Sequence, residues 1–198
     1  RAVGESADNG YEGRGGAVAV IESDAVFSDC EFKNNNAQNG ERPGGLNTNA
    51  SSYGGAVFVY LGNVTFSNST FSSNTVTKRE NGTASGGAIF AYNPASLTVT
   101  GCTFEGNTTQ NWGGAVRVEQ GNVTFSENVF TANSANENGG AVEFNNVESA
   151  SFIKNTFSKN IASTGGAVHL SNNSRNITIS ESTFSENEAT TLAAGISV

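Results

Sequence analysis

The sequence is poor in the residues on which catalysis, metal binding and membrane insertion depend. Its 198 residues include one His, two Cys, two Pro, no Met and only three Asp. No apolar run approaches the roughly 18 residues that cross a bilayer, so we expect no direct membrane insertion. Basic residues are also scarce, with 10 Lys and Arg against 18 Asp and Glu, for a net charge of −8. Because phosphate backbones are bound through basic side chains, we expect no nucleic-acid partner.

Small polar residues are abundant instead. The 24 Gly and 27 Asn would suit a disordered segment, since a chain that buries little apolar surface cannot offset its ordering entropy. However, the chain also has 13 Phe, and only 14% of its residues are charged. Disordered segments are poor in aromatic residues and carry high net charge, so this composition predicts a folded chain.

Two short motifs alternate along the whole chain. Gly-Gly-Ala-(Val/Ile) begins at Gly15, Gly54, Gly86, Gly113, Gly139 and Gly165. Phe-x-x-Asn begins at Phe32, Phe71, Phe104, Phe130, Phe157 and Phe184. Successive starts of the first motif lie 39, 32, 27, 26 and 26 residues apart. Units of this length in a fixed order are typical of solenoids, in which each repeat packs only on its neighbours.

Three stretches in each unit alternate inward apolar residues with outward residues of variable type, the pattern of strands with one buried face. In the second unit, we expect Val57 and Val59 to point inward on either side of Phe58, followed by Phe66 in the second stretch and Phe71 in the third. No stretch has a helical period. The sequence therefore predicts an all-β, single-stranded right-handed parallel β-helix of about six rungs, each with three short strands.

The repeated residue types suit the corners of such a coil. Gly-Gly supplies positive φ and close backbone approach, and Asn tolerates the left-handed region while its amide can bond to the Asn above and below. The predicted amide ladder consists of Asn35, Asn74, Asn107, Asn133, Asn160 and Asn187. We assign residues 15–198 to six rungs and the start of a seventh, and residues 1–14 to an N-terminal extension or joint.

From Gly15 to Val198, the interleaved motifs resemble the repeats of the chlamydial polymorphic outer membrane proteins. Those repeats combine Gly-Gly-Ala-(Ile/Leu/Val) with Phe-x-x-Asn, and looser versions occur in other large surface β-helix proteins. The resemblance implies an extracellular β-helix with an adhesive or structural role.

Enzymes built on β-helices need clustered carboxylates, usually with a Lys or Arg nearby. Here Glu119 and Glu143 fall at outward positions of neighbouring rungs, near Arg117. We interpret this trio as a solvated ion-pair face, with a lyase-like site as the alternative. His169 is expected to be an exposed residue with no nucleophile to activate. We therefore expect no enzyme, no catalytic residue, no metal site and no cofactor.

The two cysteines, Cys30 and Cys102, occupy equivalent positions on the first and third rungs, with Ser69 between them. Two rung heights separate them by about 10 Å, whereas a disulfide needs Cα atoms within about 7 Å. The sequence predicts two free, buried thiols that act as small hydrophobic groups.

Aromatic residues gather at outward positions of the first strand on rungs two and three, and at the preceding corner. The candidate binding residues are Tyr53, Phe58, Tyr60, Phe90, Tyr92 and Trp112. Exposed aromatic clusters mark binding sites for sugars or proteins. Alternatively, the long connections at residues 36–53 and 75–85 would fold over these rings as a roof.

Two further surface features have both a functional and a purely structural interpretation. A Thr-x-(Ser/Thr) file, which includes Thr65 with Ser67 and Thr124 with Ser126, resembles the faces of ice-binding proteins, although Thr suits any exposed strand. Asn-x-(Ser/Thr) sequons at exposed corners would carry glycans if the source cell glycosylates. The candidate glycosylation sites are Asn49, Asn63, Asn68, Asn81, Asn107, Asn122, Asn172 and Asn176.

The sequence favours a non-enzymatic β-helix at the cell surface or outside the cell, acting as a structural or adhesive stalk or as the subunit of a self-assembling filament. An open parallel edge is expected near Val198, and open edges pair with other chains. The expected partners are a second copy stacked end to end, or a host or cell-surface protein or glycan. A fragment of a longer stalk explains the open edge equally well. The alternatives, in falling order, are a glycan- or protein-binding module using the aromatic patch, an ice-binding protein, and a polysaccharide lyase or hydrolase.

Overall fold

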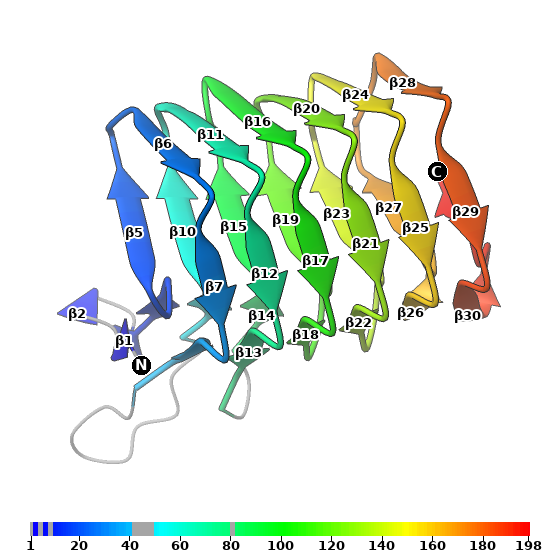
Figure 1. Ribbon diagram of the computed structural model, residues 1–198. Coiled ribbons are helices and arrows are strands. Elements are labelled where there is room, and N and C mark those ends of the chain that lie inside the picture. Colours follow the sequence, from blue (N-terminus) through cyan, green and yellow to red (C-terminus); the bar gives the residue numbers. More distant parts are fainter. Residues whose placement is uncertain (1, 4–5, 8–9, 41–49, 80–81) are drawn as a thin grey trace.

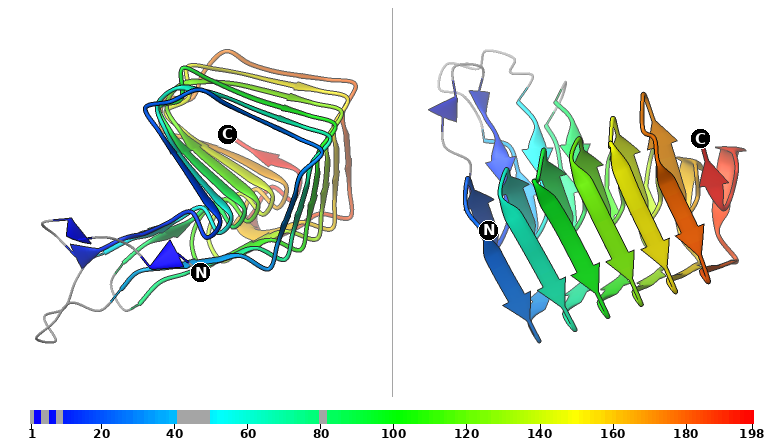
Figure 2. Two further views of the ribbon diagram at one scale, coloured as in Figure 1. Left: turned by 60° about the vertical axis from the view of Figure 1, so that its left-hand side comes forward. Right: turned by 90° about the horizontal axis from the view of Figure 1, so that it is seen from above.

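The chain is a parallel β-coil. The structure is a computed structural model that describes residues 2–3, 6–7, 10–40, 50–79 and 82–198 (Figure 1). These residues form strands and turns but no helix. Successive rungs superpose when the coil is viewed roughly along its length, in the left panel of Figure 2. The predicted all-β solenoid is confirmed.

Four sheets run along the coil, each stacked from one strand per rung. The first contains β5 (Val18–Ile21), β10 (Val57–Tyr60), β15 (Ile89–Tyr92), β19 (Val116–Glu119), β23 (Val142–Asn145), β27 (Val168–Ser171) and β31 (Ile196–Ser197). The second contains β6 (Ala25–Ser28), β11 (Asn63–Ser67), β16 (Ser96–Thr100), β20 (Asn122–Ser126), β24 (Ser149–Ile153) and β28 (Ile177–Ser180). The third contains β7 (Glu31–Lys33), β12 (Thr70–Ser72), β17 (Thr103–Glu105), β21 (Val129–Thr131), β25 (Thr156–Ser158) and β29 (Thr183–Ser185). The fourth contains β1 (Ala2–Val3), β8 (Asn36–Gln38), β13 (Thr75–Thr77), β18 (Thr108–Thr109), β22 (Ser134–Ala135), β26 (Ile161–Thr164) and β30 (Glu188–Leu192).

The fourth sheet lies where the sequence suggested only connections. Apart from β1, its strands directly follow the Asn of a Phe-x-x-Asn motif, and β18 and β22 are only 2 residues long. In β13, Val76 is buried between half-buried Thr75 and Thr77. The period-two alternation is therefore present but too short to be recognised without the neighbouring rungs. Each of the six rungs has four strands in these sheets, in place of the predicted three.

The core consists of like side chains stacked from rung to rung. The six motif phenylalanines, Phe32, Phe71, Phe104, Phe130, Phe157 and Phe184, stack with ring centroids 4.7–4.8 Å apart. That distance matches the separation of neighbouring strands in a sheet. In the second sheet, Phe125 stacks on Phe152 with centroids 5.4 Å apart. The predicted inward columns are confirmed.

The two glycines of each Gly-Gly corner have different roles. Gly113 has a φ of +67°, which a side chain would strain. At Gly114, a Cβ would lie 2.0 Å from the carbonyl oxygen of Gly140 on the next rung. The first glycine therefore supplies the left-handed turn and the second allows the rungs to approach closely.

The predicted asparagine ladder is present and is mostly buried. Asn107 Nδ2 donates to Asn133 Oδ1 at 2.9 Å, and the backbone N–H of Asn107 donates to the same oxygen at 3.0 Å. Asn107 Nδ2 also donates to the Phe71 carbonyl at 2.9 Å. The same arrangement joins Asn35 to Asn74 and continues to Asn187. Each amide thus ties its rung to the two rungs beside it.

A second ladder, which sequence reasoning missed, passes through the cysteine positions. Its members are Cys30, Ser69, Cys102, Asn128, Asn155 and Ser182. Each member after Cys30 accepts a hydrogen bond from the backbone N–H of the member on the preceding rung. Cys102 Sγ accepts from the backbone N–H of Ser69 at 3.4 Å. Cys102 is therefore a hydrogen-bond acceptor as well as an apolar group. Both thiols are free, as predicted, but only Cys102 is fully buried.

The two thiols should react with an alkylating agent at different rates. Cys30 is half-buried, whereas Cys102 is only 1% exposed. Burial also raises the pKa of the Cys102 thiol, which lowers its thiolate fraction at neutral pH. We expect iodoacetamide to label Cys30 in the native protein before Cys102. Mass spectrometry of native and urea-unfolded samples measures both rates, and equal native rates would contradict this packing.

Two strands that precede the first Gly-Gly corner, β1 and β4 (Gly13–Arg14), pair with strands of the first two rungs. β1 pairs with β8 and so covers the N-terminal edge of the fourth sheet. β2 (Ser6–Ala7) and β3 (Gly10–Tyr11) pair antiparallel. β4 (Gly13–Arg14) joins a fifth, short sheet with β9 (Ser52–Tyr53) and β14 (Ala84–Ser85), directly before the Gly-Gly corners. Isolated bridges through Trp112, Asn138 and Thr164 continue this line along the later rungs.

Candidate functional site

The outer face of the first sheet is covered where the sequence predicted an exposed aromatic patch. Phe58 in β10 is 4% exposed and Phe90 in β15 is 3% exposed, although both point away from the core. Tyr53 lies over them, with its ring centroid 4.4 Å from Phe90 and 6.2 Å from Phe58. The Arg14 guanidinium lies 5.2 Å from the Phe58 ring centroid. Of the two interpretations that the sequence left open, the roof applies to these two Phe rings, because β9 and β14, at the ends of the two long connections, lie in the short sheet beside them.

Trp112 is also part of this cover and lies apart from the other aromatic residues. Its ring packs against Arg117, with the guanidinium carbon 4.3 Å from the ring centroid. It does not line the groove that the remaining aromatic residues form. We therefore remove Trp112, along with the covered Phe58 and Phe90, from the group of exposed contact residues.

An open groove remains beside the roof. Tyr60 and Tyr92, on adjacent rungs, stack with ring centroids 5.7 Å apart and planes 10° apart, and both are half-buried. Their hydroxyls, and that of Tyr53, have no hydrogen-bond partner among the described residues. The groove measures about 210 Å³ and its floor includes Phe58 and Phe90. We call it the aromatic groove.

Ion pairs provide the charged lining of the aromatic groove. Glu12 pairs with Arg14 at 2.6 Å, and Glu119 pairs with Arg117 at 2.6 Å. Both glutamates line the groove. Glu12 and Arg14 were not singled out from the sequence, because they precede the first repeat and only the fold brings them beside β10.

The predicted solvated face of Arg117, Glu119 and Glu143 is instead mostly buried. Arg117 Nε lies 3.0 Å from Glu143 Oε2, and the Glu143 side chain is 2% exposed. Ser171 donates its hydroxyl to Glu143 Oε1 at 2.8 Å. Burial raises the pKa of Glu143, and the charge of Arg117 opposes that shift. Because buried charges need partners, this network is better explained as part of the roofed interior than as a solvated surface.

The single histidine lies in the same outer column. His169 pairs in register with Glu143 of the preceding rung and is half-buried rather than exposed as predicted. Burial lowers the pKa of its imidazole. Its Nδ1 has no hydrogen-bond partner in the part of the chain that the structure describes. No Ser or Cys hydroxyl or thiol is hydrogen-bonded to it there, so the geometry offers it no nucleophile.

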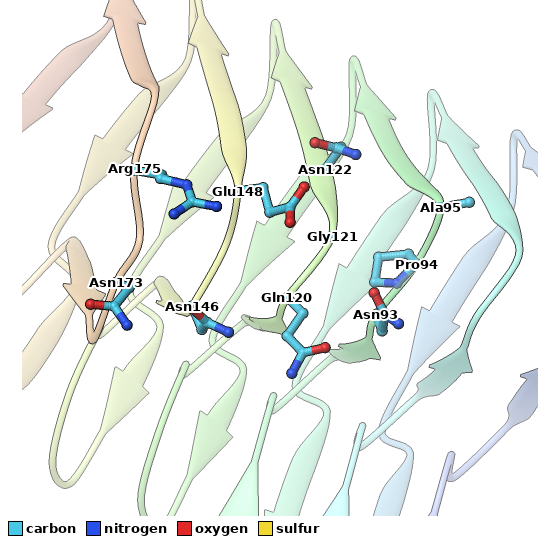
Figure 3. Close-up of a pocket in the computed structure, with 10 residues that line it drawn as sticks. All are labelled: Asn93, Pro94, Ala95, Gln120, Gly121, Asn122, Asn146, Glu148, Asn173 and Arg175. Atoms are coloured by element: carbon cyan, nitrogen blue, oxygen red, sulfur yellow. The ribbon is translucent and has the colours of Figure 1, made fainter.

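A second groove lies at the corner between the first and second sheets. Figure 3 shows its lining, which comes from the turns after β15, β19, β23 and β27. Carboxamides from Asn93, Gln120, Asn146 and Asn173 follow one another along it, with Glu148 and Arg175 near its C-terminal end. It measures about 340 Å³. We call it the corner groove, and sequence reasoning did not find it, because these amides belong to neither repeat motif.

The Thr-x-(Ser/Thr) file lies on the outer face of the second sheet, as predicted. Neighbouring hydroxyls bond across rungs, as in Thr100 with Ser126 at 2.9 Å and Ser28 with Ser67 at 2.8 Å. Val26, which interrupts the file, is 72% exposed.

The candidate glycosylation sites differ in their accessibility. Asn63, Asn68, Asn122, Asn172 and Asn176 are exposed, whereas Asn49 and Asn81 lie outside the described residues. Asn107 is 0% exposed and its amide nitrogen already donates two hydrogen bonds in the ladder. We therefore withdraw Asn107 as a glycosylation site, because attachment of a glycan there would break the ladder.

Neither a metal cluster nor a membrane helix is found in the described ranges. They contain no group of three or more His, Cys, Asp and Glu side chains placed to hold a metal ion. They also contain no helix of the length and hydropathy needed to cross a bilayer.

The stacked parallel sheets define the chain as a β-helix. The family model for the right-handed β-helix region matches residues 7–184. The chain therefore belongs to the right-handed β-helix family. No curated protein and no solved structure gives a significant match to it. The family match is to the β-helix in general, so the likeness to chlamydial repeats stays a resemblance.

Proposed function

We propose that this chain is a non-enzymatic structural or adhesive β-helix, located outside the cell or on its surface, that binds glycans through the aromatic groove. The β-helix fold is compatible with structural and adhesive roles. The outer surface of the coil is rich in hydroxyl and amide groups, and the aromatic groove is the place where partly exposed rings interrupt it.

The single observation that carries this proposal is the stack of Tyr60 on Tyr92. Both rings are held by adjacent strands in exact register, Tyr60 opposite Tyr92, so their positions are fixed before any ligand binds. A sugar ring has an apolar face, which packs on an aromatic ring, and a hydroxyl rim, which hydrogen-bonds to polar groups. The unpartnered tyrosine hydroxyls and the groove-lining ion pairs supply such groups.

Removing the two rings should abolish most glycan binding without unfolding the protein. For the double variant Tyr60→Ala, Tyr92→Ala, we expect affinity to fall by about tenfold or more, since truncation of aromatic contact residues commonly costs above ~1.4 kcal/mol. Binding is measured on immobilised oligosaccharides, followed by calorimetry. Thr98→Ala, on the outer face of β16, is the matched control, and its binding should be unchanged. Undiminished binding by the double variant would exclude the aromatic groove as the site.

A polysaccharide hydrolase is a second candidate, because two carboxylates, Glu12 and Glu119, line the same groove. Glycoside hydrolysis uses such a pair, one as acid and one as base or nucleophile. Each of these carboxylates also pairs with an arginine at 2.6 Å, Glu12 with Arg14 and Glu119 with Arg117. Release of reducing ends from bound oligosaccharides, lost in Glu119→Gln, would favour the hydrolase.

Three predictions from the sequence stay predictions: end-to-end stacking into filaments, ice binding by the threonine file, and location at the cell surface. Electron microscopy across a concentration series, ice recrystallisation assays and immunolabelling of intact cells test them in turn.

A further inference from the structure

The aromatic groove and the corner groove adjoin. Tyr92 and Glu119 line the first, and the residues that follow them in the chain, Asn93 and Gln120, line the second. Consecutive Cα atoms are about 3.8 Å apart. Tyr92 and Glu119 are also register partners on neighbouring rungs. The two grooves therefore meet at the ends of β15 and β19, with no other element between them.

The carboxamides of the corner groove are not needed to hold the corner together. Backbone bonds stack these turns: the N–H of Asn93 donates to the Glu119 carbonyl at 2.7 Å, and that of Gln120 to the Asn145 carbonyl at 2.9 Å. The side-chain amides of Asn93, Gln120, Asn146 and Asn173 have no hydrogen-bond partner within the described ranges. Whereas buried amides such as that of Asn107 are fully used in the ladder, the amides of the corner groove are left to bind a ligand.

Their spacing and charge limit the ligand. Asn93, Gln120 and Asn146 occupy equivalent positions on successive rungs, about 4.8 Å apart. This spacing is close to the length of one sugar residue in an extended chain. Each amide both donates and accepts, as a sugar hydroxyl does. Glu148 and Arg175 both line the groove (Figure 3), and their opposite charges leave it neutral. The net charge of −8 disfavours a polyanion.

From these observations we infer that the two grooves form one track for an extended, neutral, hydroxyl-rich glycan chain that lies along the coil. The inference rests on the proposed glycan-binding function and specifies its ligand: a chain several sugars long, with one end on Tyr60 and Tyr92 and the rest along the carboxamides. A short oligosaccharide contacts the tyrosines alone, whereas a long one also contacts the corner groove. Affinity therefore increases with chain length.

Oligosaccharides of increasing length test this inference in the intact protein. The probes are disaccharides to hexasaccharides derived from cellulose, laminarin, xylan, mannan and chitin, measured by calorimetry. For the series that binds, we expect the affinity to increase about tenfold from disaccharide to hexasaccharide. This increase corresponds to roughly two net hydrogen bonds. The double variant Gln120→Leu, Asn146→Leu should lose that gain and keep the wild-type affinity for the disaccharide.

The chain supplies its own control for this substitution. Leu61 occupies the equivalent corner on the second rung with a φ of +61°, close to the +65° of Gln120 and the +57° of Asn146. Leucine is therefore compatible with this backbone, and the melting temperature should be preserved. Leu61 lies outside both grooves. The reverse change, Leu61→Gln, should therefore alter neither the affinity for the disaccharide nor that for the hexasaccharide.

The outcomes separate the inference from the function on which it rests. If no series binds, the proposed function itself fails. If an oligosaccharide binds in a Tyr60-dependent way but with no effect of chain length or of the leucine pair, only the extended track is overturned. Tighter binding of pectin-derived oligogalacturonides than of any neutral series would overturn the assignment of a neutral ligand.

Discussion

Asn133→Ala should be among the most destabilising single substitutions in this protein, with a loss of about 2–6 kcal/mol. Asn133 Oδ1 accepts from the backbone N–H of Asn107 at 3.0 Å, and Asn133 Nδ2 donates to the Phe104 carbonyl at 3.0 Å. Alanine leaves both backbone groups buried without these partners, at about 1–3 kcal/mol each. Chemical denaturation followed by circular dichroism measures the loss.

The end of the ladder provides the matched control for Asn133→Ala. Asn35 is half-buried, and its side chain makes one bond, from Nδ2 to Asn74 Oδ1 at 2.9 Å. Its backbone N–H bonds to the same oxygen and would keep that bond in Asn35→Ala. We expect Asn35→Ala to cost about 0.5–1.5 kcal/mol, the net worth of one hydrogen bond. Equal losses at the two positions would show that the ladder contributes no more inside the coil than at its end.

Arg117→Leu should cost about 3–5 kcal/mol at neutral pH, because it leaves the buried Glu143 carboxylate without its cation. Arg117 Nε lies 3.0 Å from Glu143 Oε2, and the two side chains are only 6% and 2% exposed. The Ser171 hydroxyl remains as a partner of Glu143 but carries no charge. Urea denaturation at several pH values measures the loss. The double variant Arg117→Leu, Glu143→Leu should recover most of it, since a buried pair replaced by apolar residues is often neutral. Failure of that rescue would exclude the orphaned charge as the cause.

The cost of Arg117→Leu should increase as pH rises. Burial raises the pKa of Glu143 above its ordinary value even with Arg117 present. A carboxyl with a raised native pKa binds more protons in the folded state, so stability falls as pH rises from the ordinary glutamate pKa through the raised one. Without Arg117 the native pKa rises further and the effect extends to higher pH. The loss in Arg117→Leu should therefore be smallest in acid, and a loss independent of pH would contradict this origin.

Much of the fold was predictable because the same residue types recur at the same positions of every repeat unit. A Phe at the same position in six units, as in Phe71 and Phe104, identifies an inward column without any three-dimensional information. The ladder through Asn107 and the free cysteines followed from the same register. The fourth sheet was missed because strands such as β18 contain only two residues. The ladder through Cys102 and Asn128 was missed because its members differ in residue type.

The candidate site was predictable only in part. The sequence identified Tyr60 and Tyr92 as outward neighbours, and the structure stacks them. It could not show that Tyr53 and Arg14 cover Phe58 and Phe90, because the period of a strand shows which face a residue is on and not what packs against that face. The corner amides could not be predicted either, since residue type alone does not show whether the amide of a corner Asn is hydrogen-bonded in a ladder or left free.

The sequence by itself determined the coil: the rung, the register, the inward columns and the asparagine ladder all follow from identical residues recurring at each turn. Only the tertiary structure decided which outward surfaces are exposed. Residues 13–14, 52–53 and 84–85 form a short sheet beside the first one, with Tyr53 over Phe58 and Phe90, and Tyr60 and Tyr92 are left at the border. The physical reason is that the roof positions, directly before each Gly-Gly corner, are equivalent in register but differ in residue type, as in Arg14, Tyr53 and Ser85. The repeat pattern therefore does not show what these residues cover.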